Sequence, residues 1–463
     1  MNLLSRMSRR RLLAAAAPLV LLAACATPAL QDTAPPPIVF VHGNGDSAAL
    51  WQTTLWRFES NGWPRERLHA IDLPYPLARN DDTKPQPGRT STAEHMAFLR
   101  AEVEKVLKTT GASQVVLVGN SRGGNAIRNY IQNGGGAATV SHAILGGTPN
   151  HGVQAIKGFN EGSEFSGTGP FLTALNAPKN MAGDEVTGPV HWMTIRSDAN
   201  DKFAQPDGRW IGLAGKPTFV TSEGPALSGA LNVVIPRIDH RETSFSAQAF
   251  DATWLFITGR PSTTRIRPEE RPRLSGKVTG LGVDSRDPAT GSFSNNLPLP
   301  GAELAIYAVD PRTGERRGAA PTYRTTVGAN GRWGPFEADS QTPYEFVVAA
   351  PGYATTHIYR SPFPRGSEIV HLRPERIAEA DRGAAALVTM TRPRGYLDPA
   401  RDRMALDGAP PPGVPAGAGV ASAKLKLPTA APRPVAAEFN GERVVGRPWP
   451  AAEGHVTVLE LTY

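Results

Sequence analysis

A serine stands at the centre of the pentapeptide Gly119-Asn120-Ser121-Arg122-Gly123, between two segments of different pattern. The apolar run Val115–Val118 before it predicts a buried strand, and Asn125–Gln132 after it predicts a helix. A G-x-S-x-G sequence between strand and helix is typical of a nucleophile elbow, in which a strained turn exposes the serine hydroxyl and the glycines let neighbouring backbone pass closely. A glycine-rich turn without chemistry shares this pattern, so the interpretation needs a base and an acid further along the chain.

His240 is the candidate base. A serine hydroxyl is a poor nucleophile near neutral pH, and the imidazole that takes its proton must be oriented by a carboxylate. His240 follows the strand-like run Asn232–Pro236 and precedes a predicted helix over Ser244–Ile257. A loop between a late strand and the last helix is where the base lies when the chain order is serine, acid, histidine. We therefore predict that His240 removes the proton of Ser121.

Two aspartates could orient that histidine, because both follow the predicted strand His191–Arg196. They are Asp198 and Asp201, and spacing alone does not separate them. Together with Asn200 and Asp207 they could instead be oxygen ligands for calcium, but the D-x-[DN]-x-[DN]-G spacing of a calcium loop is absent. The residues leave two candidate acids and predict no metal site.

A second short motif predicts where a negative oxygen would be stabilised. The apolar run Ile38–Val41 leads into His42-Gly43-Asn44-Gly45, a loop whose backbone N–H groups are free of strand pairing. Such groups stabilise the oxyanion of a tetrahedral acyl intermediate. We expect the amide of Asn44 and that of Arg122, the residue after the nucleophile, to be the two donors. His42 is expected to be a buried scaffold residue rather than a catalytic one.

Three segments resemble the α/β-hydrolase superfamily, in its bacterial lipase and esterase branch. They are Val41–Gly45, Gly119–Gly124 and Leu145–Gly152. The resemblance covers roughly residues 36–260 and implies a cofactor-free serine hydrolase that cleaves carboxylic esters through an acyl-enzyme. It favours Asp201 as the acid, since an apolar pair and then a proline follow it as in the acid loop of many members. Asn120 and Arg122 depart from the commoner elbow residues, which predicts a more polar pocket mouth than in a typical lipase.

The pattern of elements over residues 38–259 predicts an α/β catalytic domain. Strand-like and helix-like segments alternate, which indicates a mostly parallel sheet with helices on both faces. The alternation lapses over residues 150–189, where Phe159, Phe165 and Phe171 stand among glycines. Both a lid over an acyl pocket and a satellite helix packed on the core agree with this insertion.

The C-terminal part is predicted to be all-β and sandwich-like. A linker with prolines and charges occupies residues 260–272, and short strands with turn residues follow. Residues 273–375 resemble a carboxypeptidase-regulatory or transthyretin-like β-sandwich, through the order Pro298–Leu304, Gly328–Trp333 and Pro351-Gly352-Tyr353. Residues 376–463 are predicted to form a second small β unit or an extension of the sandwich. Modules of this kind bind or stabilise rather than catalyse.

Residues 1–25 have the build of a secretory signal, with a basic start, the apolar run Leu12–Ala24 and small residues at the end. Ser8–Leu13 resembles a twin-arginine signal, although three arginines also fit an ordinary basic start. Cys25 ends a segment that resembles a lipobox, so cleavage before it would leave a thiol to carry a lipid anchor, whereas cleavage after Ala26 would discard it. We expect an exported protein, either a periplasmic or cell-envelope lipoprotein at a membrane surface or a secreted one, with a linker over residues 26–37.

The charge balance does not argue for a nucleic-acid-binding role, and we expect none. The formal net charge is +7 and falls to +3 once the four arginines of the predicted signal are removed, which is too mild for a nucleic-acid partner. The expected partner is an ester substrate, an acyl lipid or a small ester, and nothing indicates a protein partner. An inactive cell-surface binding protein with a hydrolase-like shell is the alternative. Polyester depolymerases, thioesterases and acyltransferases share the same scaffold, so the fold does not choose among them.

Overall fold

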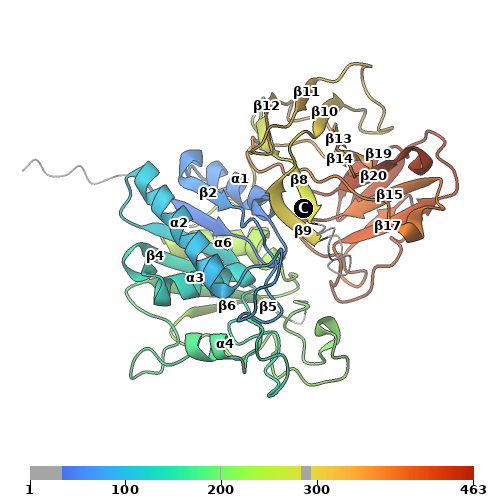
Figure 1. Ribbon diagram of the computed structural model, residues 1–463. Coiled ribbons are helices and arrows are strands. Elements are labelled where there is room, and N and C mark those ends of the chain that lie inside the picture. The colour runs from blue at the N-terminus through green and yellow to red at the C-terminus, as the bar shows by residue number, and fades with distance from the viewer. Residues whose placement is uncertain (1–33, 199, 283–292) are drawn as a thin grey trace, which may run out of the picture. The chain divides into compact units, whose positions relative to one another are not determined.

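A parallel six-stranded sheet organises the first half of the protein in the computed structural model, which describes residues 34–198, 200–282 and 293–463 (Figure 1). The strands lie in the order β2-β1-β3-β4-β5-β6. Their bounds are β1 Ile38–Val41, β2 Leu68–Ile71, β3 Val115–Asn120, β4 Val140–Gly146, β5 His191–Ser197 and β6 Leu231–Ile235. Parallel strands end at the same edge of a sheet, so the loops after β1, β3, β5 and β6 meet there.

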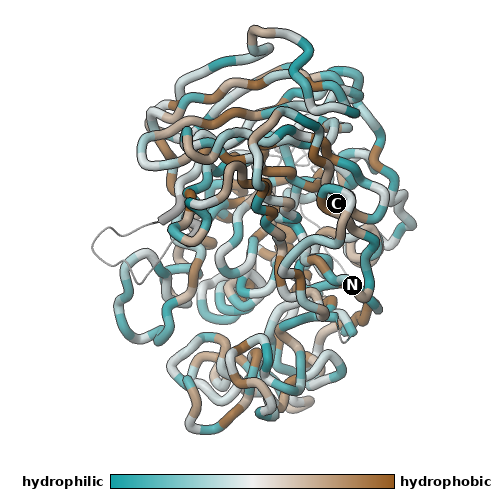
Figure 2. Tube along the Cα trace, turned by 90° about the vertical axis from the view of Figure 1, so that its right-hand side faces the viewer, coloured by the Kyte–Doolittle hydropathy of each residue, from teal (hydrophilic) through white to brown (hydrophobic). Residues whose placement is uncertain are grey.

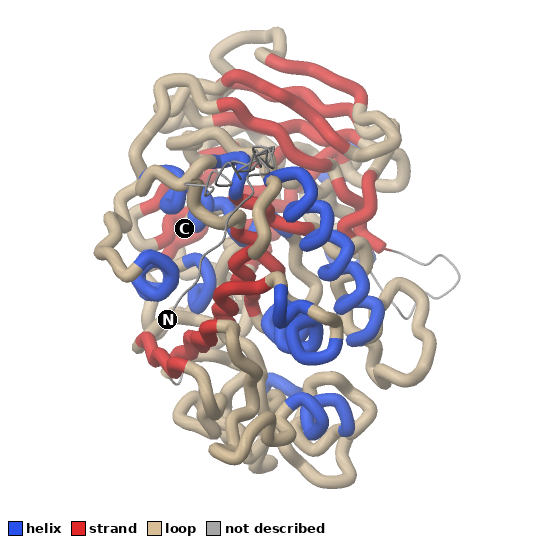
Figure 3. The backbone as a smooth tube through the Cα atoms, turned by 90° about the vertical axis from the view of Figure 1, so that its left-hand side faces the viewer, coloured by secondary structure: helices blue, strands red, loops and turns tan. Residues whose placement is uncertain are grey.

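Helices cover both faces of this sheet, as Figure 3 shows. The helices are α1 Gln52–Ser60, α2 Thr92–Thr110, α3 Arg122–Asn133, α4 Pro170–Leu175, α5 Glu242–Phe245 and α6 Ala247–Thr258. Alternate residues of each strand point to opposite faces: Phe40 packs in one core with α1 and α6, whereas Val39 packs in another with α2 and α3. Strands buried on both faces explain the continuous apolar runs in the sequence.

Local signals fix where helices begin and end. Ser91 and Glu94 form a reciprocal capping box at the start of α2, and Gly111 ends that helix in the left-handed conformation. The single helix predicted over residues 244–257 is in fact two. Ser246 has extended backbone, and its side chain accepts a hydrogen bond from the N–H of Ala249, so a new helix starts there.

The C-terminal half is all-β, which confirms the predicted fold class. A seven-stranded sheet has the order β11-β10-β13-β14-β20-β15-β17, and it is accompanied by the pairs β12-β7 and β8-β9 and the three-stranded sheet β16-β18-β19. The bounds are β7 Arg273–Lys277, β8 Thr279–Gly282, β9 Phe293–Pro298, β10 Glu303–Ala308, β11 Tyr323–Thr326, β12 Arg332–Glu337, β13 Tyr344–Ala349, β14 Thr355–Arg360, β15 Ala386–Thr391, β16 Met404–Leu406, β17 Ser422–Leu427, β18 Val435–Phe439, β19 Glu442–Gly446 and β20 His455–Glu460.

The large sheet draws its strands from both sides of residue 376. Strand β14 pairs in parallel with β20, which pairs in parallel with β15. Figure 2 shows apolar segments along the strands in the interior and hydrophilic ones on the outer loops. Because the last strand lies in the middle of the sheet, removing the end of the chain would open the sheet rather than trim its edge.

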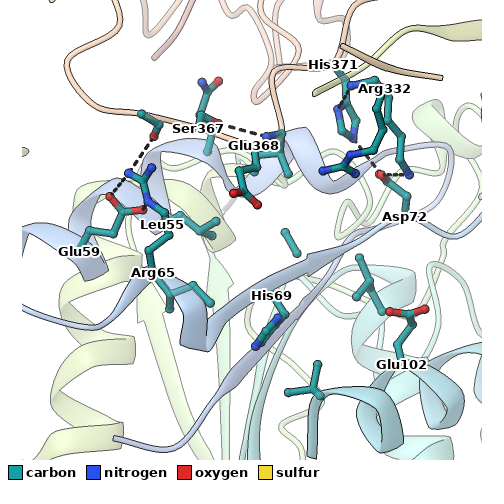
Figure 4. A pocket seen from close by; sticks show the side chains of 18 of the residues that line it. Leu55, Glu59, Arg65, His69, Asp72, Glu102, Arg332, Ser367, Glu368 and His371 are labelled. Carbon is teal, nitrogen blue, oxygen red and sulfur yellow. Dashed lines mark hydrogen bonds and ion pairs between the residues drawn. The ribbon is translucent and has the colours of Figure 1, made fainter. Parts of the chain in front are cut away.

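Buried polar contacts join the C-terminal sheets to the hydrolase sheet. The indole of Trp56 on α1 lies in the apolar core of the β region and donates to the carbonyl of Gly366 at 2.8 Å. Asp72, which follows β2, accepts a hydrogen bond from Lys277 Nζ at 2.7 Å and lies 2.9 Å from His371 Nε2 (Figure 4). The two halves therefore share both core and ion pairs.

The predicted signal segment and Cys25 lie outside the described residues. Within the part of the chain that the structure describes, none of the helices combines the length and the apolar character that spanning a bilayer requires.

Candidate active site

Ser121 stands at the junction of β3 and α3 with backbone angles of φ 52° and ψ −121°. A non-glycine residue rarely adopts a positive φ, and such strain persists only where the surroundings enforce it. Here the N–H of Ser121 donates to the carbonyl of Gly146 at 2.8 Å, which ties the turn to the end of β4. The turn has the geometry that a nucleophile elbow requires, and the side chain lines a cavity.

The glycines around this serine are required by close contacts. A Cβ atom on Gly123 would lie 2.5 Å from the carbonyl oxygen of Val41, at the end of β1. A Cβ on Gly119 would lie 2.7 Å from Ile127 Cδ1, and one on Gly124 would overlap the side chain of Thr148. The elbow therefore packs directly against the loop after β1 and the loop after β4.

His240 and Asp201 form a buried pair beside the elbow. His240 Nδ1 lies 2.9 Å from both carboxylate oxygens of Asp201. An Nδ1–H that donates to a carboxylate leaves Nε2 as the acceptor, which is the tautomer of a general base. The ring of Phe203 packs edge-on against the imidazole at 4.7 Å between centroids, and both Phe203 and His240 line the cavity that Ser121 lines.

The two candidate acids have different surroundings. Asp201 is buried and also accepts a hydrogen bond from the N–H of Phe203 at 2.8 Å. The carboxylate of Asp198 instead accepts hydrogen bonds from the N–H groups of Asn200 and Arg237, at 3.2 and 2.9 Å. Of the two, the structure brings Asp201 to the histidine and uses Asp198 to hold a loop.

Two backbone amides near Ser121 are free of protein acceptors in the part of the chain that the structure describes. They are the N–H groups of Asn44 and Arg122, and Asn44 lines the cavity with Ser121. The Asn44 side chain accepts from the N–H of Ala78 at 2.7 Å, which fixes its loop. His42 is buried between the Gly43 carbonyl and the Leu73 N–H, at 2.9 and 3.1 Å, and burial lowers its pKa. These contacts give His42 a scaffold position.

The side chain of Arg122 does not contribute to the cavity, contrary to the expected polar pocket mouth. It is fully buried and donates to both oxygens of Glu164 at 2.8 Å, and to the carbonyls of Pro76 and Thr90 at 3.1 and 2.7 Å. Helix α3 turns this side chain away from the strand end, toward acceptors that satisfy its charge. Asn120, by contrast, does line the cavity.

Two family models match the chain. Residues 35–182 match the family described as Lipase (class 2), and residues 270–377 match the family described as Lipase C-terminal domain. Together with the parallel sheet, these matches support the lipase branch of the α/β-hydrolase superfamily. The first match contains the elbow and the loop after β1, and the second contains strands β7 to β14. The chain is accordingly a hydrolase of the lipase and esterase type.

Solved lipases share only a weak overall likeness with this α/β-hydrolase. The mature form of Bacillus licheniformis lipase BlEst2 is 18% identical, over 48% of this chain and 92% of that chain, with a TM-score of 0.33. Aspergillus fumigatus lipase B is 14% identical over 50% and 54%, with a TM-score of 0.32. Paleococcus ferrophilus monoacylglycerol lipase is 11% identical over 49% and 97%, also with a TM-score of 0.32. The support for the lipase branch therefore comes from the family matches and from the parallel sheet.

The cavity of this hydrolase is about 230 Å³ and mainly apolar. Its apolar walls come from four separate parts of the chain, namely Pro149 and Val153, Phe165, Phe203 with Ile211, and Tyr396. An apolar pocket with a few polar groups at one end suits an acyl chain whose carbonyl must meet a nucleophile. Tyr396 comes from the C-terminal half, and sequence reasoning did not find it.

The insertion at residues 150–189 is anchored to the hydrolase core at several points. Leu172 and Leu175 of α4 are buried, and the buried guanidinium of Arg128 donates to Asn176 Oδ1 at 2.8 Å. Gln132 Nε2 of α3 donates to the carbonyl of Glu185 at 2.9 Å, and within the insertion His151 Nε2 lies 2.8 Å from Glu185 Oε1. Its residues Val153 and Phe165 reach the cavity, so the insertion forms one wall of the site.

The described residues contain no group of three or more His, Cys, Asp or Glu side chains arranged to hold a metal ion. The aspartates weighed as calcium ligands are instead hydrogen-bonded to backbone: Asp207 accepts from the N–H of Arg209 at 3.1 Å, and Asp198 and Asp201 have the contacts given above.

Proposed function

We propose that this protein hydrolyses carboxylic esters with Ser121 as nucleophile, His240 as general base and Asp201 as the orienting acid. The observation that carries the proposal is the hydrogen bond of His240 Nδ1 to Asp201, at 2.9 Å, beside a cavity lined by both His240 and the strained Ser121. A hydroxyl, an imidazole and a carboxylate in this order are the groups that acyl transfer needs.

The reaction runs in two halves. His240 Nε2 takes the hydroxyl proton as Ser121 Oγ attacks the ester carbonyl, and the negative oxygen is held by the N–H groups of Asn44 and Arg122. His240 then gives the proton to the leaving alcohol, and the acyl-enzyme remains. Water attacks the acyl-enzyme with His240 again accepting a proton, and the acid is released as Ser121 recovers its proton. Asp201 stays ionised and stabilises the imidazolium throughout.

The cavity supports a proposal for the substrate class. Apolar walls of Val153, Phe165 and Ile211 suit an acyl chain, and a volume of about 230 Å³ holds a short or medium chain better than a long one. We therefore propose small or medium acyl esters as substrates. Thioesters and polyesters react by the same steps, and they are outcomes of the substrate profile rather than separate proposals.

A fluorophosphonate probe and a series of p-nitrophenyl esters test the proposal. The purified protein should be labelled, should hydrolyse butyrate and hexanoate esters, and should lose both properties in Ser121→Ala with an unchanged melting temperature. A folded wild-type protein that neither labels nor turns over would reject the proposal in favour of an inactive binding protein.

The choice of acid is tested by a matched pair of variants. Asp201→Asn removes the charge beside His240, whereas Asp198→Asn changes a carboxylate that accepts hydrogen bonds from two backbone N–H groups and from the Ser197 hydroxyl. We expect kcat to fall by about 10⁴-fold in Asp201→Asn, as in triads with a misplaced tautomer. The Asp198→Asn enzyme should stay within about tenfold of wild type. The reverse order would assign the acid to Asp198.

We also propose that the protein is exported and that Cys25 carries a lipid anchor. The support is the sequence alone, because the basic start, apolar run and lipobox-like end lie outside the described residues. Expression with radiolabelled palmitate should label the wild type and not Cys25→Ser. Unlabelled protein that begins after residue 26 would instead indicate cleavage by an ordinary signal peptidase.

A further inference from the structure

The loop that bears His240 is organised by two acidic residues, one on each side of it: Asp239 is buried, and the side chain of Glu242 is 15% exposed. Asp239 Oδ1 accepts hydrogen bonds from the N–H groups of Arg241 and Glu242, at 2.8 and 3.0 Å. Glu242 Oε2 in return accepts from the N–H of Asp239 at 2.6 Å. This reciprocal pattern is that of a capping box, here on the turn that leads into α5, and His240 lies within it.

Two arginines from the C-terminal half hold the outer side of that box. Arg392 donates from Nη1 to Asp239 Oδ2 at 2.8 Å and from Nη2 to Glu242 Oε1 at 2.6 Å. Arg401 donates from Nη1 to Glu242 Oε2 at 2.6 Å. The backbone N–H of Tyr396 completes the set with a 2.8 Å hydrogen bond to Asp239 Oδ2. The carboxylates of Asp239 and Glu242 are thus each neutralised by a residue more than 140 positions away in the chain.

These contacts are shielded from water. Asp239 has no exposed surface, and only 3% of the Arg392 side chain is exposed. Although burial opposes ionisation of Asp239, Arg392 and Arg401 hold the pKa of that carboxyl below its usual range. Ion pairs in such surroundings are barely screened, and loss of one partner leaves an uncompensated buried charge. The box therefore depends on the C-terminal arginines for its geometry.

The same C-terminal segment also reaches the loop of the acid. Lys202, next to Asp201, donates from Nζ to the carbonyl of Gly419 at 2.9 Å, and Arg209 donates to the carbonyl of Ala416 at 3.0 Å. Residues 392–419 thus contact the loops of both groups that form the His240–Asp201 pair. They lie outside the two segments that match family models, which end at residues 182 and 377.

We propose that Arg392 and Arg401 are positioning residues that hold the His240 loop in place for reaction with Ser121. The restraint itself is independent of the chemistry, and its effect on turnover rests on the proposed function. An imidazole displaced by about 1 Å costs on the order of 100-fold in rate, so the loop must be held by rigid partners. The C-terminal half would then take part in catalysis through His240, in addition to forming a pocket wall.

A comparison of Arg392→Met with Arg394→Met tests the restraint. Arg394 is equally buried two residues away, but its hydrogen bonds go to the carbonyls of Thr462 and Leu461 and its ion pair to Glu460, rather than to residues 239–242. Hydrogen exchange of the full-length protein, followed by mass spectrometry, should show faster exchange over residues 238–246 in Arg392→Met only. Equal protection of this segment in the two variants would overturn the proposal, whatever their activity.

Turnover supplies the second measurement. We expect kcat for a p-nitrophenyl ester to fall by tenfold to 100-fold in Arg392→Met, with KM within about twofold, because substrate binding does not involve the box. In the double variant Arg392→Met and Asp239→Asn, kcat should fall by less than the product of the two single-variant factors. Both substitutions remove the same contact between Arg392 and Asp239. A multiplicative loss, or an equal loss in Arg394→Met, would contradict a positioning role.

A third variant guards against misfolding. If Arg392→Met does not fold, Arg401→Met at the less buried arginine removes one of the two arginine hydrogen bonds to Glu242 and should raise exchange over the same segment by a smaller amount. If the variants differ in exchange as expected but the wild type hydrolyses no ester, the proposed function is rejected and the loop restraint still holds. The two failures are therefore separable.

Discussion

The guanidinium of Arg122 lies 2.8 Å from each carboxylate oxygen of Glu164, so the residue after the proposed nucleophile anchors the insertion at residues 150–189. Both side chains are almost completely buried. The side chain of Arg122 holds the wall that carries Phe165, and its backbone amide is one of the two oxyanion donors that we propose. A single residue links the elbow to the acyl pocket.

Removal of this ion pair should destabilise the protein strongly. Burial raises the pKa of Glu164, and its partner Arg122 opposes that shift, so Arg122→Met leaves a carboxyl group buried without compensation. We expect the free energy of unfolding to fall by about 3 kcal/mol in urea titrations. Arg271→Met, which breaks the exposed pair with Glu337, should leave it unchanged within error. Equal effects of the two substitutions would contradict this account.

The contact between the elbow and the loop after β1 should not tolerate a side chain. In Gly123→Ala the new methyl group would meet the carbonyl oxygen of Val41 at 2.5 Å, so the loop carrying Asn44 must shift. We expect a loss of about 1–3 kcal/mol in stability. The kcat should fall by about 100-fold, since one oxyanion donor is displaced. Gly383→Ala is the control, because a Cβ there has no neighbour within 4 Å. Its stability and kcat should equal those of wild type.

Much of the fold and of the proposed triad could be predicted because the signals are local. The six parallel strands of the hydrolase follow from apolar runs that end in glycine or polar loops, and Ser121 from a motif of five residues. The helix predicted over residues 244–257 was only partly right, since the break at Ser246 depends on a hydroxyl that caps a new helix. Asp201 and Asp198 stood three residues apart, and only the path of the loop separates them.

What could not be predicted depends on contacts between distant segments. The direction of the Arg122 side chain is set by Glu164, and the surroundings of His240 are set by Arg392 and Arg401. The D-x-x-E spacing of Asp239 and Glu242 is a local signal for a capping box that sequence reasoning could have used. Nothing in the sequence identifies which of the many arginines bind it, since a guanidinium finds its partner only once both sheets have formed.

The free energy of unfolding should fall in the acid pH range as Asp72 becomes protonated. Burial opposes ionisation of this carboxyl, but its partners His371 and Lys277 outweigh burial and hold the pKa of Asp72 well below its usual value. A depressed pKa adds stability above the unfolded value of about 3.9, and this contribution is lost as the pH falls through the folded value. Asp72→Asn should therefore be less stable than wild type at neutral pH, and the difference should shrink below about pH 4. Urea unfolding across this range measures it, and a difference that is constant with pH would assign the effect to packing alone.

Tyr396 should limit the length of the acyl chain, because its side chain is the wall that the C-terminal half adds to the cavity. Lys202 Nζ lies 4.0 Å from the centre of its ring and the Arg241 guanidinium carbon 4.9 Å, so two cations hold the phenol in place. Its hydrogen bond to Asp239 comes from the backbone N–H, so Tyr396→Ala enlarges the pocket and keeps the contact with the His240 loop.

Each further methylene group that the enlarged pocket buries adds about 0.8 kcal/mol of binding free energy. The ratio of kcat/KM for p-nitrophenyl octanoate to that for butyrate should then rise by about tenfold or more. Tyr75→Ala is the control, because this exposed residue does not line the cavity, and its ratio should match wild type. An unchanged ratio in Tyr396→Ala would mean that the acyl chain leaves the cavity by another side, along Val153 and Phe165.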